Sequence, residues 1–228
     1  MMPLLVLFDI DGTLLRPSGV GRRSLDRAFL ELYGRVAVFE GMRFHGRTDP
    51  EIVGDGLALV GAPASDFGDV VDRYLAHLEV EVADGPPLAL PGAAALVELL
   101  DSREDVLLGL VTGNVRRGAE IKLGRDDLFR RFPIGAFGDD HADRSELIRL
   151  ARRRAGEAGH GDFDPARTLY VGDTERDVEA ARIGGAVAVA VATGNMALET
   201  LAETSPDHLL PSLEPASRFL QEVLLCPR

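Results

Sequence analysis

The stretch LLVLFDIDGTL, residues 4–14, joins an apolar run to two aspartates and a glycine. A continuous apolar run such as residues 4–8 is typical of a parallel strand that is buried on both faces. Asp9 and Asp11 follow at the point where that strand would end. Because open α/β sheets bind ligands outside the carboxyl ends of their strands, we expect both carboxylates to face a site there.

Two carboxylates this close repel each other unless a cation joins them. Carboxylate oxygens are ligands that suit Mg²⁺. Gly12 permits a tight turn with positive φ, and Thr13 can bond to the local backbone. The alternative interpretation is a turn in which the aspartates only cap backbone groups.

The bulk composition predicts one large domain or two modest ones. The chain has 228 residues, 46% of them apolar, and a formal net charge of −12. This acidic balance argues against nucleic acid as the main partner, because phosphate backbones attract basic proteins. It still allows a local cationic site that binds a small phosphorylated substrate.

Cys226 is the only cysteine, so no intrachain disulfide can form, which suits a reducing cytosol. The first predicted strand begins near residue 1 without a signal-peptide pattern. No apolar run approaches the length of a membrane span. We therefore expect a cytoplasmic protein with no membrane partner. Monomer and homodimer stay open as alternatives.

Hydrophobic patterns predict strands and helices that alternate along most of the chain. Strands are predicted at residues 4–8, 106–111, 134–137, 168–171, 187–191 and 208–210. Helices are predicted at residues 22–33, 50–60, 66–82, 91–100, 114–123, 145–155 and 175–183. This alternation implies an α/β fold, a Rossmann-like doubly wound parallel sheet with helices on both faces.

A helical segment, residues 16–87, interrupts the alternation after the first strand. The breaker cluster Asp84-Gly85-Pro86-Pro87 marks its second linker. We predict that residues 1–15 and 88–228 form the α/β core and that residues 16–87 form an inserted helical cap.

Two further strand ends carry polar motifs. Thr112-Gly113-Asn114 follows the strand at 106–111 and offers a hydroxyl and backbone N–H groups to an anion. Gly172-Asp173-Thr174-Glu175-Arg176-Asp177 follows the strand at 168–171 and places two carboxylates about one helical turn apart. Ordinary helix capping is the alternative interpretation of both motifs.

The loop at residues 138–144 places Arg144 just before a predicted helix at the same edge of the sheet. A solvated surface charge is the alternative for Arg144. The loop aspartates at 139, 140 and 143 are expected to be solvated or capping residues rather than metal ligands.

These motifs, in this order and each after a strand, resemble those of the haloacid dehalogenase superfamily. The matching residues are Asp9-Ile10-Asp11-Gly12-Thr13, Thr112-Gly113-Asn114 and Gly172-Asp173-Thr174-Glu175-Arg176-Asp177. The likeness extends over nearly the whole chain. The helical insertion resembles the C1-type cap of phosphoglycolate phosphatase and β-phosphoglucomutase relatives.

The resemblance implies a role for each motif residue. Asp9 would be the nucleophile that forms an aspartyl-phosphate, and Asp11 would serve as general acid and then general base. Asp9, the backbone carbonyl of Asp11 and Asp173 would hold Mg²⁺, with Asp177 in support. Thr112 would bond the transferring phosphoryl group, with Gly113 and Asn114 beside it.

The chain departs from the family pattern at the phosphate-binding cation. A lysine often precedes the helix before the last motif, and Arg144 holds that place here. Lys122 is the alternative, although it lies in a helix body. We favour Arg144, because arginine can clamp phosphate through two hydrogen bonds.

In the cap, Arg47 is a candidate for binding an anionic or hydroxylated part of the substrate. A surface position at the start of a helix is an equal alternative for it.

The leading functional hypothesis is a Mg²⁺-dependent phosphatase for a small phosphorylated metabolite. A phosphomutase of the β-phosphoglucomutase type would share the chemistry but return the phosphoryl group to the substrate. A dehalogenase is less favoured, because Asp11 supplies an acid–base group and the metal-binding set is complete. A non-catalytic phosphoester-binding protein on the same fold is the hypothesis from a different class.

Overall fold

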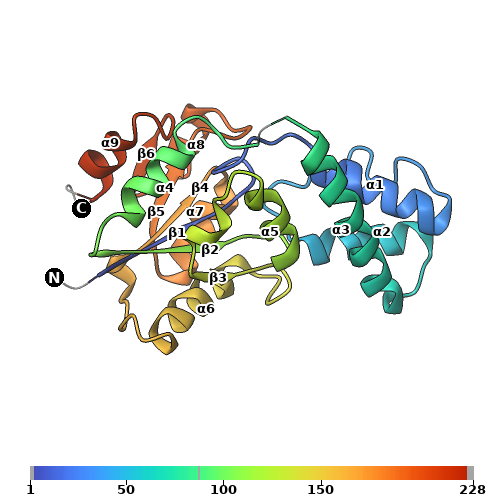
Figure 1. Cartoon of the computed structure of the whole chain (residues 1–228), viewed down its shortest axis with the longest axis horizontal. Coiled ribbons are helices and arrows are strands. Elements are labelled where there is room, and N and C mark those ends of the chain that lie inside the picture. The colour runs from blue at the N-terminus through green and yellow to red at the C-terminus, as the bar shows by residue number, and fades with distance from the viewer. Residues whose placement is uncertain (1–2, 87, 225–228) are drawn as a thin grey trace.

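A six-stranded, fully parallel sheet forms the centre of the protein (Figure 1), which is described here from a computed structural model. The structure describes residues 3–86 and 88–224, so Cys226 lies outside the described residues. The strand order is β3-β2-β1-β4-β5-β6. The strands are β1 Leu4–Phe8, β2 Val106–Val111, β3 Ile134–Ala136, β4 Thr168–Gly172, β5 Val187–Val191 and β6 His208–Leu210. The predicted fold class is confirmed.

The apolar run that opens the chain is the central strand β1. Leu5 and Leu7 pack into the apolar cluster under one face of the sheet, and Val6 and Phe8 pack into the cluster under the other face. Successive side chains of a strand point to opposite faces, so a strand covered on both faces must be apolar throughout.

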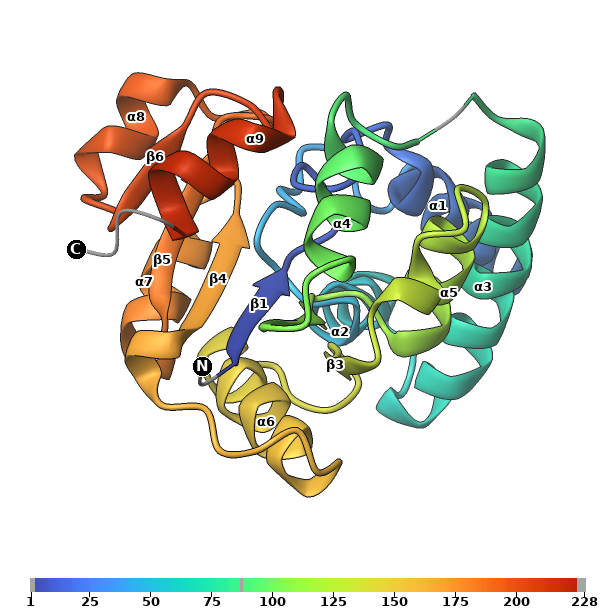
Figure 2. The same cartoon turned by 60° about the vertical axis from the view of Figure 1, so that its left-hand side comes forward.

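Helices cover both faces of the sheet, as Figure 2 shows. On one face lie α4 Ala93–Asp101, α5 Arg116–Gly124 and α9 Ala216–Phe219, and on the other lie α6 Arg144–Glu157, α7 Glu175–Gly184 and α8 Leu198–Glu203. Short 3₁₀ turns span Ala64–Asp66, Phe129–Arg131 and Pro165–Arg167, and a π-helical turn spans Leu220–Leu224.

The predicted elements match those of the structure to within two residues at each end. One shift of two residues is at α5, which begins at Arg116 rather than at residue 114 because Val115 has extended backbone angles, φ −61° and ψ 148°. The predictions did not include α8 and α9, which have only six and four residues. Segments this short carry too few positions to show a helical period.

Three helices lie to one side of the sheet (Figure 1): α1 Val20–Tyr33, α2 Asp49–Val60 and α3 Phe67–Asp84. We call these helices and their loops the cap. Buried side chains such as Phe29 and Tyr74 pack between them, and the Phe29 and Phe39 rings meet edge to face at 5.1 Å. The apolar centre of the cap therefore belongs to the same cluster that covers one face of the sheet.

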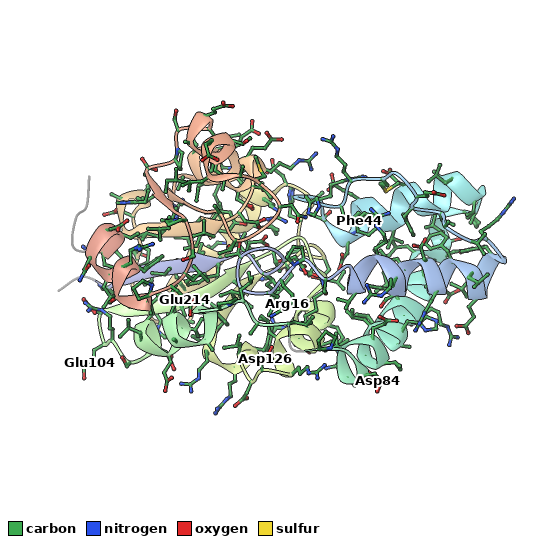
Figure 3. The ribbon with its side chains drawn as sticks, turned by 90° about the horizontal axis from the view of Figure 1, so that it is seen from above. Arg16, Phe44, Asp84, Glu104, Asp126 and Glu214 are labelled. Atoms are coloured by element: carbon green, nitrogen blue, oxygen red, sulfur yellow. The ribbon has the colours of Figure 1, made fainter. Side chains whose placement is uncertain are left out.

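The two chain segments that connect the cap to the sheet lie side by side. The Arg16 N–H donates to the Leu88 carbonyl at 2.8 Å, and the Leu90 N–H donates to the Leu14 carbonyl at 2.9 Å. Figure 3 shows Arg16 between the sheet and the cap. The division into domains at residues 15 and 88 stays a prediction.

Within residues 3–86 and 88–224, no helix is both long enough and apolar enough to cross a membrane.

Candidate active site

The ends of three neighbouring strands bring the predicted acidic residues together. Strand β1 pairs with β2 on one side and with β4 on the other, in register at Phe8–Leu110 and Phe8–Val171. The residues that follow β1, β2 and β4 therefore lie together at the edge of the sheet formed by the carboxyl ends of the strands. There the Asp9 N–H donates to the Val171 carbonyl at 2.9 Å, which places Asp9 beside the loop that carries Asp173.

Asp9, Asp173 and Asp177 form a buried acidic cluster whose carboxylate oxygens lie within 4.8 Å of one another. Burial raises the pKa of Asp9 to about 6, and the charges of Asp177 and Asp11 add to this rise against the opposing charge of Arg144. Burial, with repulsion from Asp177 and Asp9, raises the pKa of Asp173 to about 8.

The Asp9 Oδ1 atom is buried and has no hydrogen-bond partner among the residues that the structure describes. A buried, unpartnered carboxylate oxygen is costly, and a cation would remove both that cost and the mutual repulsion. The cluster therefore fits a divalent metal ion with a preference for oxygen ligands.

Asp173 is held by two loops. The Thr13 hydroxyl donates to its Oδ1 at 3.2 Å, and Gly12, with φ of 92°, turns the β1 loop as predicted. On the other side, a Cβ on Gly194 would lie 1.7 Å from Asp173 Oδ2. Only glycine lets the loop after β5 approach this carboxylate so closely.

Asp177 is fixed by the start of α7. The Thr174 hydroxyl donates to its Oδ2 at 2.6 Å in a capping box, where Thr174 also accepts from the Asp177 N–H. Its other oxygen, Oδ1, accepts from Arg144 at 2.5 Å and from the Tyr170 hydroxyl at 3.0 Å. Asp177 therefore takes part in capping α7 and also belongs to the acidic cluster.

Asp11 lies in a second group with Asn114 and Lys122. The Lys122 ammonium donates to Asp11 Oδ2 and to Asn114 Oδ1, both at 2.7 Å, and the Asn114 amide donates to Asp11 Oδ2 at 2.8 Å. The same amide also donates to the Thr112 hydroxyl at 2.8 Å, which ties the Thr112 motif to this group.

These contacts set the ionisation of Asp11. Partial loss of hydration in the site would raise the pKa of Asp11, but the charge and hydrogen bond of Lys122 and the Asn114 hydrogen bond outweigh this effect and lower it. Burial would likewise lower the pKa of Lys122, but Asp11 and Asp49 raise it. Both groups are thus charged at neutral pH.

Both candidate phosphate-binding cations line the site. Arg144 lies on the side of Asp9, with its Nη1 atom 3.3 Å from Asp9 Oδ2, whereas Lys122 lies on the side of Asp11. Each side chain is at least nine-tenths buried. The preference for Arg144 over Lys122 as the phosphate ligand stays a prediction.

A cavity of about 360 Å³ opens above these residues, between the sheet edge and the cap. Asp11 is 43% exposed and faces it. Gly113 and Arg47 also line it, and the Arg47 guanidinium pairs with Asp55 at 2.7 Å. The role of Arg47 in binding substrate therefore stays a prediction.

The loop aspartates after β3, which the sequence predicts to be solvated or capping residues, bond to backbone N–H groups or to an arginine. Asp139 accepts from the Arg116 N–H, Asp140 pairs with Arg154, and Asp143 caps α6 by accepting from the Ser145 N–H.

The sequence patterns did not indicate two other contributors to the site. Tyr170, on β4, donates to Asp177 and faces Arg144. The loop after β5 donates from the Thr193 hydroxyl to the Gly12 carbonyl at 2.7 Å. Asp49 belongs to the segment 45–49, which the sequence does indicate as facing the pocket, and it accepts from the Val115 N–H at 3.0 Å. The motif Thr193-Gly194-Asn195 follows a predicted strand, so the rule that identified the other strand ends would also have found this loop.

Comparisons with known proteins agree with this geometry. The chain matches the family model of haloacid dehalogenase-like hydrolases over residues 4–185. It is 35% identical over 153 residues to a phosphoglycolate phosphatase of Synechococcus elongatus, which covers 66% of this chain and 68% of that protein. It is 29% identical over 205 residues to an N-acetylmuramic acid 6-phosphate phosphatase of Pseudomonas aeruginosa, which covers 83% and 81%.

Among solved structures, a hydrolase from Pseudomonas syringae has a similar fold, with a TM-score of 0.73 at 20% identity over 96% of this chain and 99% of that one. The family resemblance predicted from the three motifs is confirmed.

Proposed function

Because this chain belongs to the haloacid dehalogenase-like hydrolases, we propose that it is a Mg²⁺-dependent phosphatase of a small phosphorylated metabolite. The observation that carries the proposal is the convergence of Asp9, Asp173 and Asp177 within 4.8 Å, beside the buried cations Lys122 and Arg144. Such a site combines a carboxylate nucleophile with positive charge for a phosphoryl group.

Asp9, Asp173 and the backbone carbonyl of Asp11 would hold Mg²⁺, with Asp177 supporting it directly or through water. When bound, Mg²⁺ supplies neutralisation of the phosphoryl oxygens, which lets an anionic carboxylate approach phosphorus.

Asp9 attacks the phosphorus atom, and a new bond forms between its carboxylate oxygen and phosphorus as the bond to the leaving oxygen breaks. Asp11 gives a proton to the leaving oxygen. The negative charge of the bound phosphate favours the protonated form of Asp11 in the complex, although Lys122 favours the ionised form in the free enzyme.

In the second step Asp11, now ionised, takes a proton from water, and the water oxygen attacks phosphorus. Phosphate leaves, and the Asp9 carboxylate is restored. Thr112 and the backbone of Gly113 contribute donors to the phosphoryl oxygens, while Arg144 and Lys122 offset their charge.

The test is phosphate release from a panel of phosphoesters with and without Mg²⁺. The names of the relatives make 2-phosphoglycolate and N-acetylmuramic acid 6-phosphate the first substrates to try, followed by pyrophosphate, sugar phosphates and nucleotides. We expect Mg²⁺-dependent turnover of at least one of them. Asp9→Asn should reduce it to background, and Asp11→Asn should reduce it by about 10²–10⁴-fold.

Asp162→Asn is the matched control, because Asp162 is an exposed aspartate of the core outside the cavity, and it should retain wild-type turnover. No Mg²⁺-dependent release from any substrate, with Asp9→Asn equal to wild type, would overturn the proposal. Isomerisation of a sugar phosphate without phosphate release would instead identify a phosphomutase.

We also propose a partner and a compartment for this protein. The partner is a small phosphorylated molecule, and the compartment is the cytoplasm, as expected from the single cysteine. Localisation of the tagged full-length chain checks the second.

A further inference from the structure

One short segment of the cap, residues 45–49, contacts three core loops at the site, those after β2, β4 and β5. It reaches the loop after β2 through Asp49 and the start of α7 through the Gly46 carbonyl, which accepts from Arg176 at 3.3 Å. It reaches the loop after β5 through His45, whose Nε2 atom lies 2.9 Å from the Asn195 amide nitrogen. The segment is thus one place where the cap contacts the active-site edge of the sheet; helix α3 also contacts α5, through the ion pair of Glu79 with Arg117.

Asp49 makes the most enclosed of these contacts. Its N–H donates to the Gly113 carbonyl at 2.7 Å, and its Oδ2 accepts from the Val115 N–H at 3.0 Å. The two bonds hold the cap to opposite ends of the turn at 113–115. The approach is so close that a Cβ on Gly113 would lie 2.3 Å from the Arg47 carbonyl oxygen.

The local sequence of the cap fixes this position. Thr48 caps α2, and Glu51 completes a capping box by accepting from the Thr48 N–H at 2.9 Å. Asp49 is therefore the first residue of α2, with its backbone held at the helix start. An aspartate there commonly stabilises its own helix, but this one turns to a helix of the core.

The receiving helix, α5, needs an acceptor from outside. Its N-cap residue is Val115, whose apolar side chain cannot accept a hydrogen bond. The Asp49 carboxylate accepts from the N–H of Val115, as the acid of a capping box accepts from the N-cap N–H, and Asp139 of the core accepts from the next N–H, that of Arg116. At the other end of the same helix is Lys122, which holds Asp11.

We propose that Asp49 is a positioning residue, which caps α5 across the cap–core boundary and so couples docking of the cap to the placement of Lys122 and Asp11. With the cap docked, the turn at 113–115 and α5 are held for catalysis. With the cap lifted, the Val115 N–H turns to water, and the start of α5 keeps the bond to Asp139 but loses the bond that crosses the cap–core boundary. Only the kinetic consequence rests on the proposed function, because the coupling itself is a property of the fold.

Hydrogen exchange in the ligand-free protein tests the coupling without any substrate. In Asp49→Ala, peptides from residues 112–124 should exchange faster than in wild type, while peptides from β1 and β4 should be unchanged. Asp49→Asn keeps an oxygen that can accept from Val115, so it should exchange nearly as wild type does. Asp72→Ala, at an exposed position on the cap helix α3, is the control and should match wild type.

If the protein is a phosphatase, Asp49→Ala should lower kcat by about 10- to 100-fold, the range expected for loss of a charge-assisted hydrogen bond. Asp49→Asn should recover most of it. The proposal is overturned if exchange in residues 112–124 is the same in Asp49→Ala and wild type, or if Asp49→Asn behaves like Asp49→Ala. If the wild type has no phosphatase activity but Asp49→Ala still exchanges faster than wild type in residues 112–124, the proposed function is refuted and the coupling is supported.

Discussion

Lys122 is the only lysine in the sequence, and it is buried against the carboxylate that we assign to acid–base catalysis. An ammonium in that place is a compact charge with three donors, and two of them are used by Asp11 and Asn114. Lys122, together with the hydrogen bond from Asn114, lowers the pKa of Asp11 against the loss of hydration in the site, which acts in the opposite direction.

Replacing this charge should move the pH dependence of catalysis. In Lys122→Gln the ammonium charge no longer favours the ionised form of Asp11, so the pKa of Asp11 should rise. The limb of the kcat/KM profile that belongs to Asp11 should shift to higher pH. Arg117→Gln is the control, because Arg117 is an exposed cation of the same helix that pairs with Glu79 and Glu120. An unshifted limb in Lys122→Gln would contradict this assignment.

At the scale of single elements, the start of α7 stabilises the helix and also orients a residue of the acidic cluster. Thr174 and Asp177 satisfy each other's backbone N–H groups, so the motif that caps α7 also sets the direction of the Asp177 carboxylate. The two interpretations of this motif, capping and ligand binding, are therefore compatible.

Loss of the Thr174 hydroxyl should destabilise the protein by about 1 kcal/mol, the usual cost of removing an N-cap. Urea unfolding of Thr174→Ala in the presence of a chelator measures this change. Thr174→Ser keeps the hydroxyl and should lose little. If serine is as destabilising as alanine, the methyl group of Thr174 and not its hydrogen bonds stabilises the start of the helix.

Elements with a clear hydrophobic pattern were predictable from the sequence, and contacts between distant segments were not. The strand β1 and the long helix α3 each show many apolar positions with one period, so their existence followed from the pattern. Asp9, Asp11 and Asp173 were predictable because each stands directly after such a strand.

The bond between Asp49 and Val115 joins residues 66 positions apart in the sequence, and its two partners belong to different helices. No local pattern contains that information. The same reason explains why the choice between Arg144 and Lys122 could not be made from spacing alone, since the fold brings both side chains to the site from opposite sides.

At the scale of the whole molecule, the acidic cluster should make the metal-free protein less stable as the pH rises. The pKa values of Asp9 and Asp173, about 6 and about 8, lie above their usual value of 3.8, so the folded chain binds these protons more tightly than the unfolded chain. Their contribution to the free energy of unfolding is fully present below about pH 4 and is lost as the pH rises through about 6 and then about 8. The loss is at most about 1.4 kcal/mol per pH unit for each group.

Thermal unfolding from about pH 5 to about pH 9, with a chelator or with excess Mg²⁺, measures this dependence. We expect Tm to fall with pH under chelation and to be restored by Mg²⁺, because a ligand that binds only the folded state stabilises it. In Asp173→Asn the fall between about pH 6 and about pH 8 should disappear. If the Tm of the wild type in the presence of a chelator is constant over that interval, the raised pKa of Asp173 is contradicted.

The paired connections between cap and sheet have a consequence for how the inserted segment can be replaced during evolution. The chain leaves β1 and returns toward α4 at nearly the same point, where Leu14–Arg16 and Leu88–Leu90 are joined by backbone hydrogen bonds. A segment of any fold can be inserted at that point if its two ends lie equally close together. The strand order of the sheet then stays the same. The residues at the sheet edge and the cap can thus be exchanged independently of each other.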